Sequence, residues 1–432
     1  MTSRQPRRRV RTPPPGVSWT KRLGPGLITG AADDDPSGVA TYSQAGAQFG
    51  PNLLWTVILC YPLMVAVQLI SARIGRVTGA GLAANMGRVL PKAVVGVLVG
   101  LLFVANTINI GADVGAMGAA ANLVSGWNAK LLTVVFTVAS LLLQLFVPYH
   151  RYVHLLKWLT LALFAYVGVI FTVHIDWAEV LTRTFIPRLH LSAAALTTIV
   201  AVFGTTISPY LFFWQSSEEV EDLEASGEHD LRHSTRAQAK RELERIRWDT
   251  VVGMAFSEII AFFIILTTAV TLHAAGKTDI QSSEQAALAL KPIAGPLAFF
   301  FFSSGIIGAG LLAVPVLAGS SAYAISEAFE WKRGLEHEPW EAPGFYAVIV
   351  GAMVLALGVI FSPLDPIKTL FWSAVVNGVI AVPIMAGMMI VGSRPREMGR
   401  YVASHTLRGL GWAATAIMAA AAIAMFVAGP GS

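Results

Sequence analysis

Apolar runs long enough to cross a lipid bilayer recur along nearly the whole of this 432-residue chain. A helix needs about 20 apolar residues to span the hydrocarbon layer. Inside lipid, every backbone polar group must be hydrogen-bonded within the protein, which restricts spanning segments to helices or closed barrels. Runs this long and continuous predict helices. Eleven of them are centred on 23–48, 52–72, 93–123, 131–148, 155–175, 194–216, 249–273, 294–328, 344–362, 367–392 and 409–428.

The composition agrees with a membrane protein that crosses the bilayer many times. Hydrophobic residues make up 55% of the chain and charged residues only 13%, whereas soluble domains carry about 25% charged residues. The single cysteine, Cys60, excludes an internal disulfide framework and any cysteine-rich metal cluster.

The basic residues predict the orientation of the helices, because Lys and Arg accumulate in cytoplasmic loops. With the N-terminus placed inside, the alternate segments assigned to the outside hold only Lys130, Arg183, Arg188, Lys277, Lys291 and Lys368 of the 31 Lys and Arg residues. The sequence therefore predicts a cell-membrane protein with a cytoplasmic N-terminus and an external C-terminus. Residues 1–22 are basic and proline-rich, which predicts a disordered cytoplasmic tail.

The long polar interruption at 217–248 predicts a cytoplasmic loop. Its second part, AQAKRELERIR, has helix-forming composition and mixed charge. Such a pattern is typical of a solvated helix.

Three consecutive aspartates interrupt the first apolar run, in GAADDDPSGVATYSQAG. Asp35 follows Arg22 by 13 residues, about 20 Å of helix, which places it well inside a hydrocarbon layer of about 30 Å. A carboxylate at that depth costs at least about 2.5 kcal/mol and is a functional candidate by default. Pro36 and Gly38 predict that the helix unwinds over Asp35–Gly38. A carboxylate beside the freed carbonyl oxygens predicts a cation site.

Asp33 and Asp34 have two interpretations that the sequence leaves open. They either approach the metal or face a water-filled vestibule. Adjacent carboxylates in a dry site raise one another's pKa, so at least one of the three aspartates is expected to reach water or to carry a proton.

A second broken helix is predicted five helices later, in VAVFGTTISPYLFFWQ, where Gly204 and Pro209 lie near the middle. Discontinuous helices at matching positions in two repeats are the best sequence pointer to a transporter's binding site. Because five is odd, the second repeat must have inverted topology. The prediction is an all-α 5+5 inverted repeat over 23–175 and 194–392, with helices one and six unwound and an eleventh peripheral helix at 409–428.

These residues resemble the Nramp family of divalent metal transporters, which have a LeuT-type fold. GPGLITGAADDDPSGVATYSQAGAQFG resembles the family's first helix, with its Asp-Pro-Gly-Asn break and an A-T-x-x-Q-A-G-A run. LLWTVIL and LISARIGRVTG resemble the second helix, and GTTISPYLFF resembles the G-A-T-V-M-P-H-N segment of the sixth.

The resemblance implies a metal site and also shows departures from the family pattern. The family's metal-binding aspartate falls on Asp35, and its asparagine partner falls on Gly38. The methionine of helix six falls on Ser208, and the carbonyl ligand falls on Thr205.

The resemblance also covers residues that lie around the metal site in the family. The histidine after the helix-six proline becomes Tyr210, and a second histidine becomes Gln215. In helix three, Asp113 matches one acid of a proton-carrying pair, whereas the other becomes Ala116. Asn377 in helix ten lies near a polar residue of the family that faces the site and is a candidate for a water-mediated ligand.

The departures predict the kind of ion carried. Thioether suits softer transition metals, while carboxylate, carbonyl, hydroxyl and water suit Mg²⁺ and Mn²⁺. Mg²⁺ keeps several waters when bound, so a wider all-oxygen site suits it. The expected function is transport of Mg²⁺ and Mn²⁺, inward and with weak or no proton coupling, by a monomer without cofactor or nucleic acid partner. A proton-coupled Mn²⁺ or Fe²⁺ transporter is the alternative.

Three other functional classes fit less well. A Mg²⁺-dependent membrane prenyltransferase would use DDDP and the acidic run at Glu218–Asp222 as its two motifs, but it needs both at the membrane rim. A sodium-coupled carrier of small organic solutes usually binds a substrate carboxylate, which three acids at the site would repel. A passive channel has no need for two broken helices. We therefore expect a transporter and not an enzyme.

Overall fold

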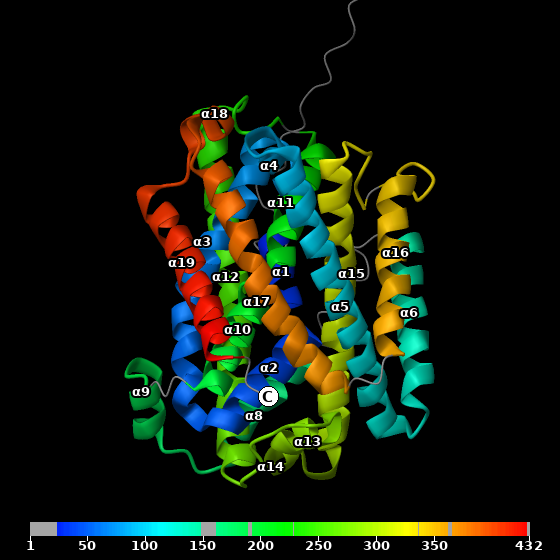
Figure 1. The fold of residues 1–432 in the computed structure, drawn as a ribbon, viewed down its shortest axis with the longest axis vertical. Coiled ribbons are helices and arrows are strands. Elements are labelled where there is room, and N and C mark those ends of the chain that lie inside the picture. Colours follow the sequence, from blue (N-terminus) through cyan, green and yellow to red (C-terminus); the bar gives the residue numbers. More distant parts are fainter. Residues whose placement is uncertain are drawn as a thin grey trace, which may run out of the picture.

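The computed structural model describes residues 24–147, 161–188, 192–227, 229–335, 337–361 and 365–429. Every regular element within these ranges is a helix. The long helices stand roughly parallel in one bundle, and the shorter ones cover its two ends (Figure 1). The all-α membrane fold predicted from the apolar runs is confirmed.

The first half of the bundle begins with a helix in two pieces, α1 (Pro25–Asp33) and α2 (Pro36–Phe49). A 3-10 turn, η2 (Gly50–Leu53), leads directly into the next long helix. The remaining helices of this half are α3 (Leu54–Thr78), α4 (Leu82–Val89), α5 (Lys92–Ser125), α6 (Ala129–Phe146), α8 (Ala165–Val169) and α9 (Trp177–Phe185), with η3 (Leu161–Phe164) before α8.

The second half also begins with a helix in two pieces, α10 (Ala193–Thr206) and α11 (Pro209–Ser226). The long helices that follow are α12 (Arg236–Thr268), α15 (Ala298–Ala328), α16 (Pro343–Ile360), α17 (Pro366–Gly392) and α19 (His405–Ala428). Short elements connect them: η4 (Ala269–His273), α13 (Ser283–Ala287), η5 (Leu288–Leu290), α14 (Lys291–Ala294), η6 (Gly295–Leu297), α18 (Pro395–Met398) and η7 (Gly399–Tyr401).

Eight segments of the described chain are long and apolar enough to cross a membrane, and α16 is a shorter apolar helix. One of the eight, Pro36–Thr78, joins α2 to α3 and so covers parts of two predicted helices. Ten of the eleven predicted helices therefore have a counterpart. Much of the fifth, predicted at 155–175, lies outside the described residues, and η3 and α8 represent its second part.

Both breaks lie close to where proline predicted them, but the first differs in detail. The unwinding expected at Asp35–Gly38 is wrong by one to two residues, because the backbone leaves the helix at Asp34 and Asp35 and Gly38 lies inside α2. Pro36 occupies the first position of α2, where its missing N–H costs nothing and its fixed φ favours helix initiation. Proline here starts a helix instead of prolonging the break.

The polar stretch at 217–248 is shorter as a loop than the sequence suggested. Helix α11 continues to Ser226, and α12 already begins at Arg236. The predicted helix in AQAKRELERIR is present, but it forms the first turns of α12 and is continuous with the spanning part. Its first residue is set by an N-cap, because the Thr235 hydroxyl accepts from the Gln238 N–H at 3.3 Å.

Ion pairs tie these helical extensions together at the end of the bundle that carries α4 and α18 (Figure 1). Arg76 of α3 contacts Asp222 at 2.8 Å and Glu242 at 2.9 Å. Arg245 of α12 contacts Glu219 at 2.6 Å. The side chains of Arg76 and Glu219 are 3% and 0% exposed, so the pairs cross-link α3, α11 and α12 at a buried level.

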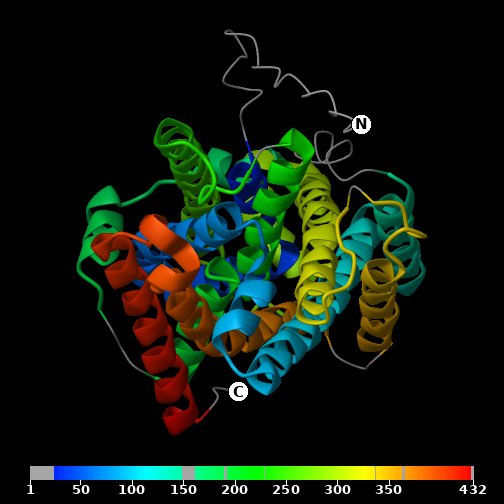
Figure 2. The same ribbon diagram turned by 90° about the horizontal axis from the view of Figure 1, so that it is seen from above.

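Helix α1 lies in the middle of the bundle, between α11, α12 and α15 (Figure 2). It packs on α12 backbone to backbone. A Cβ atom at Gly30 would lie 2.2 Å from the carbonyl oxygen of Gly253, so no larger residue fits there. This contact fixes the broken helix against α12.

Candidate functional site

Asp35 sits at the first break and caps the helix that follows it. Its backbone is extended, with φ −72° and ψ 169°, and its Oδ1 accepts from the Gly38 N–H at 2.6 Å. A carboxylate at a helix N-terminus is favoured by the helix dipole. Asp35 is 2% exposed, so the break places a charged group deep inside the bundle in a fixed orientation.

The second carboxylate oxygen of Asp35 is held by α5. Asn109 donates to Asp35 Oδ2 at 3.0 Å and approaches Asp113 Oδ2 at 3.3 Å. The Asn109 Oδ1 accepts from the Ser373 hydroxyl at 2.8 Å. One amide therefore links the two predicted acids, Asp35 and Asp113, and ties them to α17.

The second break faces the first. The backbone leaves the helix at Ile207 and Ser208, and Ser208 makes no side-chain cap for α11. Its hydroxyl lies 2.8 Å from the Gly204 carbonyl oxygen and 2.7 Å from that of Thr205. A Cβ atom at Gly204 would lie 2.1 Å from a carbonyl oxygen of α17. Glycine thus lets α10 and α17 touch just before the break.

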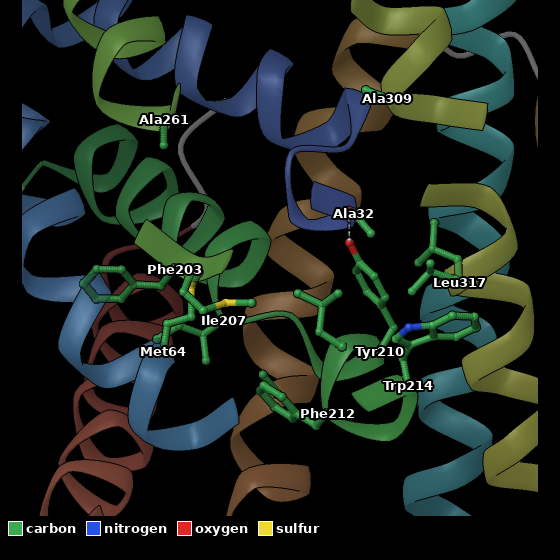
Figure 3. Packing of buried hydrophobic residues seen from close by; sticks show 14 of the residues in the cluster. Ala32, Met64, Phe203, Ile207, Tyr210, Phe212, Trp214, Ala261, Ala309 and Leu317 are labelled. Atoms are coloured by element: carbon green, nitrogen blue, oxygen red, sulfur yellow. Dashed lines mark hydrogen bonds between the residues drawn. The ribbon is translucent and has the colours of Figure 1, made fainter. Parts of the chain in front are cut away.

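Three contacts join the two broken helices. The Tyr210 hydroxyl donates to the Ala32 carbonyl at 3.1 Å, as Figure 3 shows, and this satisfies a carbonyl that the end of α1 leaves free. The Tyr42 and Thr206 hydroxyls lie 2.9 Å apart. A Cβ atom at Gly38 would be 3.2 Å from the Thr205 hydroxyl. Of the predicted ligand positions, Asp35, Gly38 and Thr205 are therefore brought to one place.

Ser208 and Asn377 are placed nearby without a direct contact to Asp35. The Ser208 hydroxyl turns back onto its own helix end, as described above. Asn377 is 2% exposed, and its Oδ1 has no hydrogen-bond partner in the described part of the chain. It precedes Gly378, whose backbone packs against Gly204. A free buried acceptor beside the second break suits a water-mediated ligand, and that role of Asn377 stays a prediction.

Asp33 and Asp34 turn toward α12 and not toward α5. The Ser257 hydroxyl lies 2.5 Å from Asp33 Oδ2 and 3.1 Å from Asp34 Oδ1. The other oxygen of each aspartate is buried without a hydrogen-bond partner among the described residues, and so are both oxygens of Glu258. Glu258 is within electrostatic range of both aspartates. These three acids form a second group, on the opposite side of the break from Asn109.

The side-chain and backbone atoms near the breaks that could bind a metal ion are oxygen atoms. Within the described ranges, no three side chains from among His, Cys, Asp and Glu converge as a ready metal cluster. A metal ion at the breaks would therefore rely on the Asp35 carboxylate together with backbone carbonyls, hydroxyls and water. Such a donor set fits Mg²⁺, Ca²⁺ or Mn²⁺.

Sequence reasoning missed several residues that shape this site: Asn109, Ser373, Ser257, Tyr42 and Thr206. One of them left a signal. Asn106, Asn109 and Asp113 recur at spacings of three and four in an otherwise apolar helix, which places them on one face. Ser373, Ser257 and Thr206 left no such signal, because Ser and Thr hydroxyls in helices can bond their own backbone.

Comparison with known proteins gives a consistent family assignment. The family model for natural resistance-associated macrophage protein-like (Nramp) proteins matches residues 26–428. A divalent metal cation transporter MntH of Klebsiella pneumoniae subsp. pneumoniae is 26% identical over 410 residues, which cover 92% of this chain and 91% of that protein.

Solved structures agree on the fold. A manganese transporter of Eremococcus coleocola superposes with a TM-score of 0.73 at 16% identity, covering 96% of this chain and 88% of that one. A nucleobase-cation-symport-1 family transporter superposes with a TM-score of 0.58 at 13% identity, covering 94% and 92%. These likenesses confirm the fold predicted from the two broken helices.

Proposed function

Because the chain belongs to the Nramp family, we propose that it carries divalent metal cations across a cell membrane by alternating access, with Mg²⁺ and Mn²⁺ as the favoured ions. The MntH protein and the Eremococcus coleocola protein named above are metal transporters, which leaves the prenyltransferase alternative without support. We propose further that the protein works as a monomer with its N-terminus in the cytoplasm.

One observation carries this proposal most directly. Five carboxyl groups are buried around the first break: Asp33, Asp34, Asp35, Asp113 and Glu258 are between 0% and 5% exposed. Within the described ranges, no Lys, Arg or His forms an ion pair with any of them. Buried charges are normally paired or bind metal ions. A negative interior without fixed cations is suited to attract a mobile cation.

The ion is proposed to bind at Asp35 between the two breaks. The Thr205 carbonyl and the Ser208 hydroxyl would supply oxygen ligands, Gly38 would leave room for water, and Asn377 would act through a water molecule. Ser208 stands where the family has a soft sulfur ligand, so the site favours hard ions that keep part of their hydration shell.

Asp33 and Asp34 are proposed to act beside this site and not in it. They face Ser257 and Glu258, on the side of α12. Their negative potential would raise the local concentration of cations without direct coordination. Tyr210 is proposed to hold the two broken helices together in the conformation described here.

Transport is proposed to run inward without obligatory protons. A membrane potential supplies about 2.3 kcal/mol per charge per 100 mV, or about 4.6 kcal/mol for a divalent ion. The alternative, a proton-coupled transition-metal transporter, draws support from the Asn109 bridge, because it connects the carboxyl groups of Asp35 and Asp113. Under that alternative Asp113 would belong to a proton pathway.

The test is uptake of Mg²⁺, Mn²⁺ and Ca²⁺ into proteoliposomes with a pH-sensitive dye inside. We expect Mg²⁺ and Mn²⁺ uptake without acidification, abolished by Asp35→Ala and retained by Asp279→Asn, which removes an exposed acid far along the chain. We also expect Ser208→Met to shift the preference from Mg²⁺ toward Mn²⁺. Uptake of Mn²⁺ alone with acidification would support the proton-coupled alternative, and no metal uptake would refute the proposal.

A further inference from the structure

A basic pocket of about 560 Å³ opens where α3 ends, α12 begins and η7 leads toward α19. It lies at the end of the bundle that carries α18 (Figure 1), remote from the helix breaks. Its lining contains five bases and Tyr401; the bases are Arg73, Arg236, Lys240, Arg247 and Arg400. The only acid in the lining described is Glu244.

Helical spacing places the bases of α12 on one face. Arg236, Lys240 and Arg247 are separated by four and seven residues, which is the period of a single helix face. The neighbouring face of α12 carries Glu242 and Arg245, whose charges are used in ion pairs with α3 and α11. One charged face of α12 therefore forms ion pairs inside the protein, and the other face lines the pocket.

The pocket's positive charge is poorly compensated. Arg73, Arg236 and Arg247 form no ion pair with a carboxylate in the described ranges. Lys240 and Glu244 are 3.9 Å apart, and their side chains are 78% and 59% exposed. An ion pair so exposed to water contributes little to stability.

The η7 side of the pocket adds two groups with hydrogen-bonding capacity. The Arg400 guanidinium lies 5.0 Å from the Tyr401 ring centroid and donates to the Ser234 carbonyl at 3.2 Å. The Tyr401 hydroxyl is buried and has no hydrogen-bond partner among the described residues. It is a donor without an acceptor in the wall of a basic pocket.

The depth of the pocket matches the membrane surface. Arg73 follows the start of α3 at Leu54 by 19 residues, about 28 Å of helix, close to the thickness of the hydrocarbon layer. Trp248, next to Arg247, is 59% exposed, and exposed Trp residues mark the interface between membrane and water. Directly beside the bases lies a small apolar cluster of Leu69, Ala72 and Ile246.

We propose that this pocket binds the phosphate-bearing headgroup of an acidic phospholipid. The guanidinium groups of Arg73, Arg236 and Arg247 bind phosphate oxygens, which accept charge-assisted hydrogen bonds from arginine, and the Tyr401 hydroxyl donates one more. The acyl chains lie against the exposed Trp248, while the buried apolar cluster supports the wall of the pocket from inside. Basic pockets at this level between spanning helices suit such lipids.

Binding of this lipid joins α3, α12 and the segment leading to α19. A ligand that binds only the folded protein stabilises it by mass action. The protein should therefore unfold at a higher temperature with an acidic lipid than with a zwitterionic one.

The experiment uses the full-length protein in a neutral detergent, with native mass spectrometry and thermal unfolding as readouts. It is titrated separately with phosphatidylglycerol, with phosphatidylcholine and with inorganic pyrophosphate. The test variant is Arg236→Gln with Arg247→Gln. The matched control is Arg241→Gln with Arg396→Gln, which removes the same charge from exposed positions outside the pocket.

We expect phosphatidylglycerol to bind and to raise the unfolding temperature, phosphatidylcholine to do neither, and the test variant to bind about 25-fold more weakly, at about fivefold for each base removed. The control variant should bind like the native protein. Equal weakening in both variants would overturn the proposal in favour of general surface attraction. Pyrophosphate binding as tight as lipid binding would overturn the assignment to a lipid, and unfolding of the ligand-free variants at the native temperature excludes misfolding as the cause.

Discussion

Replacing Asp35 with asparagine should separate the role of its charge from the role of its shape. Asparagine caps a helix as well as aspartate does, so the bond from the Gly38 N–H, 2.6 Å in the native protein, is kept. The new amide would face the Asn109 donor, now 3.0 Å from Asp35 Oδ2. Asn109 can respond by turning its own amide over.

That rearrangement has a small structural cost. The turned Asn109 no longer donates to Asp113 Oδ2, which lies 3.3 Å from its amide nitrogen in the native protein. Its amide can instead donate to the Ser373 hydroxyl, which keeps its own bond to the Leu370 carbonyl oxygen at 2.7 Å. The net loss is about one hydrogen bond, or about 1 kcal/mol. Removing a buried carboxylate that lacks a basic partner offsets part of it. We therefore expect stability without metal to change by less than about 1 kcal/mol.

Metal binding should respond very differently. Two unit charges 4 Å apart interact by about 4 kcal/mol at an effective dielectric constant of 20, and a divalent ion doubles that attraction before desolvation is subtracted. Even if desolvation cancels half, about 4 kcal/mol remains, which corresponds to a loss of affinity of nearly a thousandfold.

The assay is calorimetric titration of Mn²⁺ and Mg²⁺ into the purified native protein, Asp35→Asn and Asp35→Ala, with thermal unfolding of each. Asp35→Ala should lose both the metal and the helix cap, at about 1 kcal/mol for the cap, whereas Asp35→Asn should lose only the metal. Metal affinity of Asp35→Asn within threefold of the native value would refute the assignment of Asp35 as the charged ligand. A large loss of stability in Asp35→Asn would refute the geometry given for Asn109.

Three further changes test other parts of the structure. Gly204→Ala should destabilise the protein by about 1–3 kcal/mol, because its Cβ would lie 2.1 Å from a carbonyl oxygen of α17, whereas Gly100→Ala, with open space around it, should not; equal unfolding temperatures would contradict the packing. Arg245→Ala should cost about 3–5 kcal/mol in denaturant unfolding, because it removes the partner 2.6 Å from the fully buried Glu219, and Arg245→Lys should recover part of that stability. Asn109→Ala should raise the metal concentration for half-maximal uptake about 10–100-fold through the loss of support for the ligand, and unchanged uptake would show that the bridge is dispensable.

Much of the fold follows from local sequence. The apolar runs predict helices because lipid offers no partner for a free backbone group. Pro36 and Pro209 predict the two breaks because proline has no N–H to donate to the preceding turn. Asp35 is a predictable candidate because a carboxylate at this depth requires compensation. The exact position of the first break is less predictable, because proline both ends one helix and starts the next.

The directions of the three adjacent aspartates are not readable from sequence. Asp35 turns to Asn109 of α5, while Asp33 and Asp34 turn to Ser257 of α12. Their separation depends on the two dihedral angles at Asp34, where the backbone leaves the helix at φ −80° and ψ 55°. A change in these angles would rotate the Asp35 carboxylate relative to that of Asp33.

The sequence by itself determined that this chain spans a membrane, that two of its helices break near Pro36 and Pro209, and that aspartate lies at the first break. Only the tertiary structure decided which polar groups lie near the breaks, because Asn109, Thr205 and Asn377 come from three other helices. It also decided which bases of α12 pair internally and which line the basic pocket. Hydrophobicity and proline act along the chain and leave a local pattern, whereas ligand geometry and charge pairing depend on how distant helices are packed.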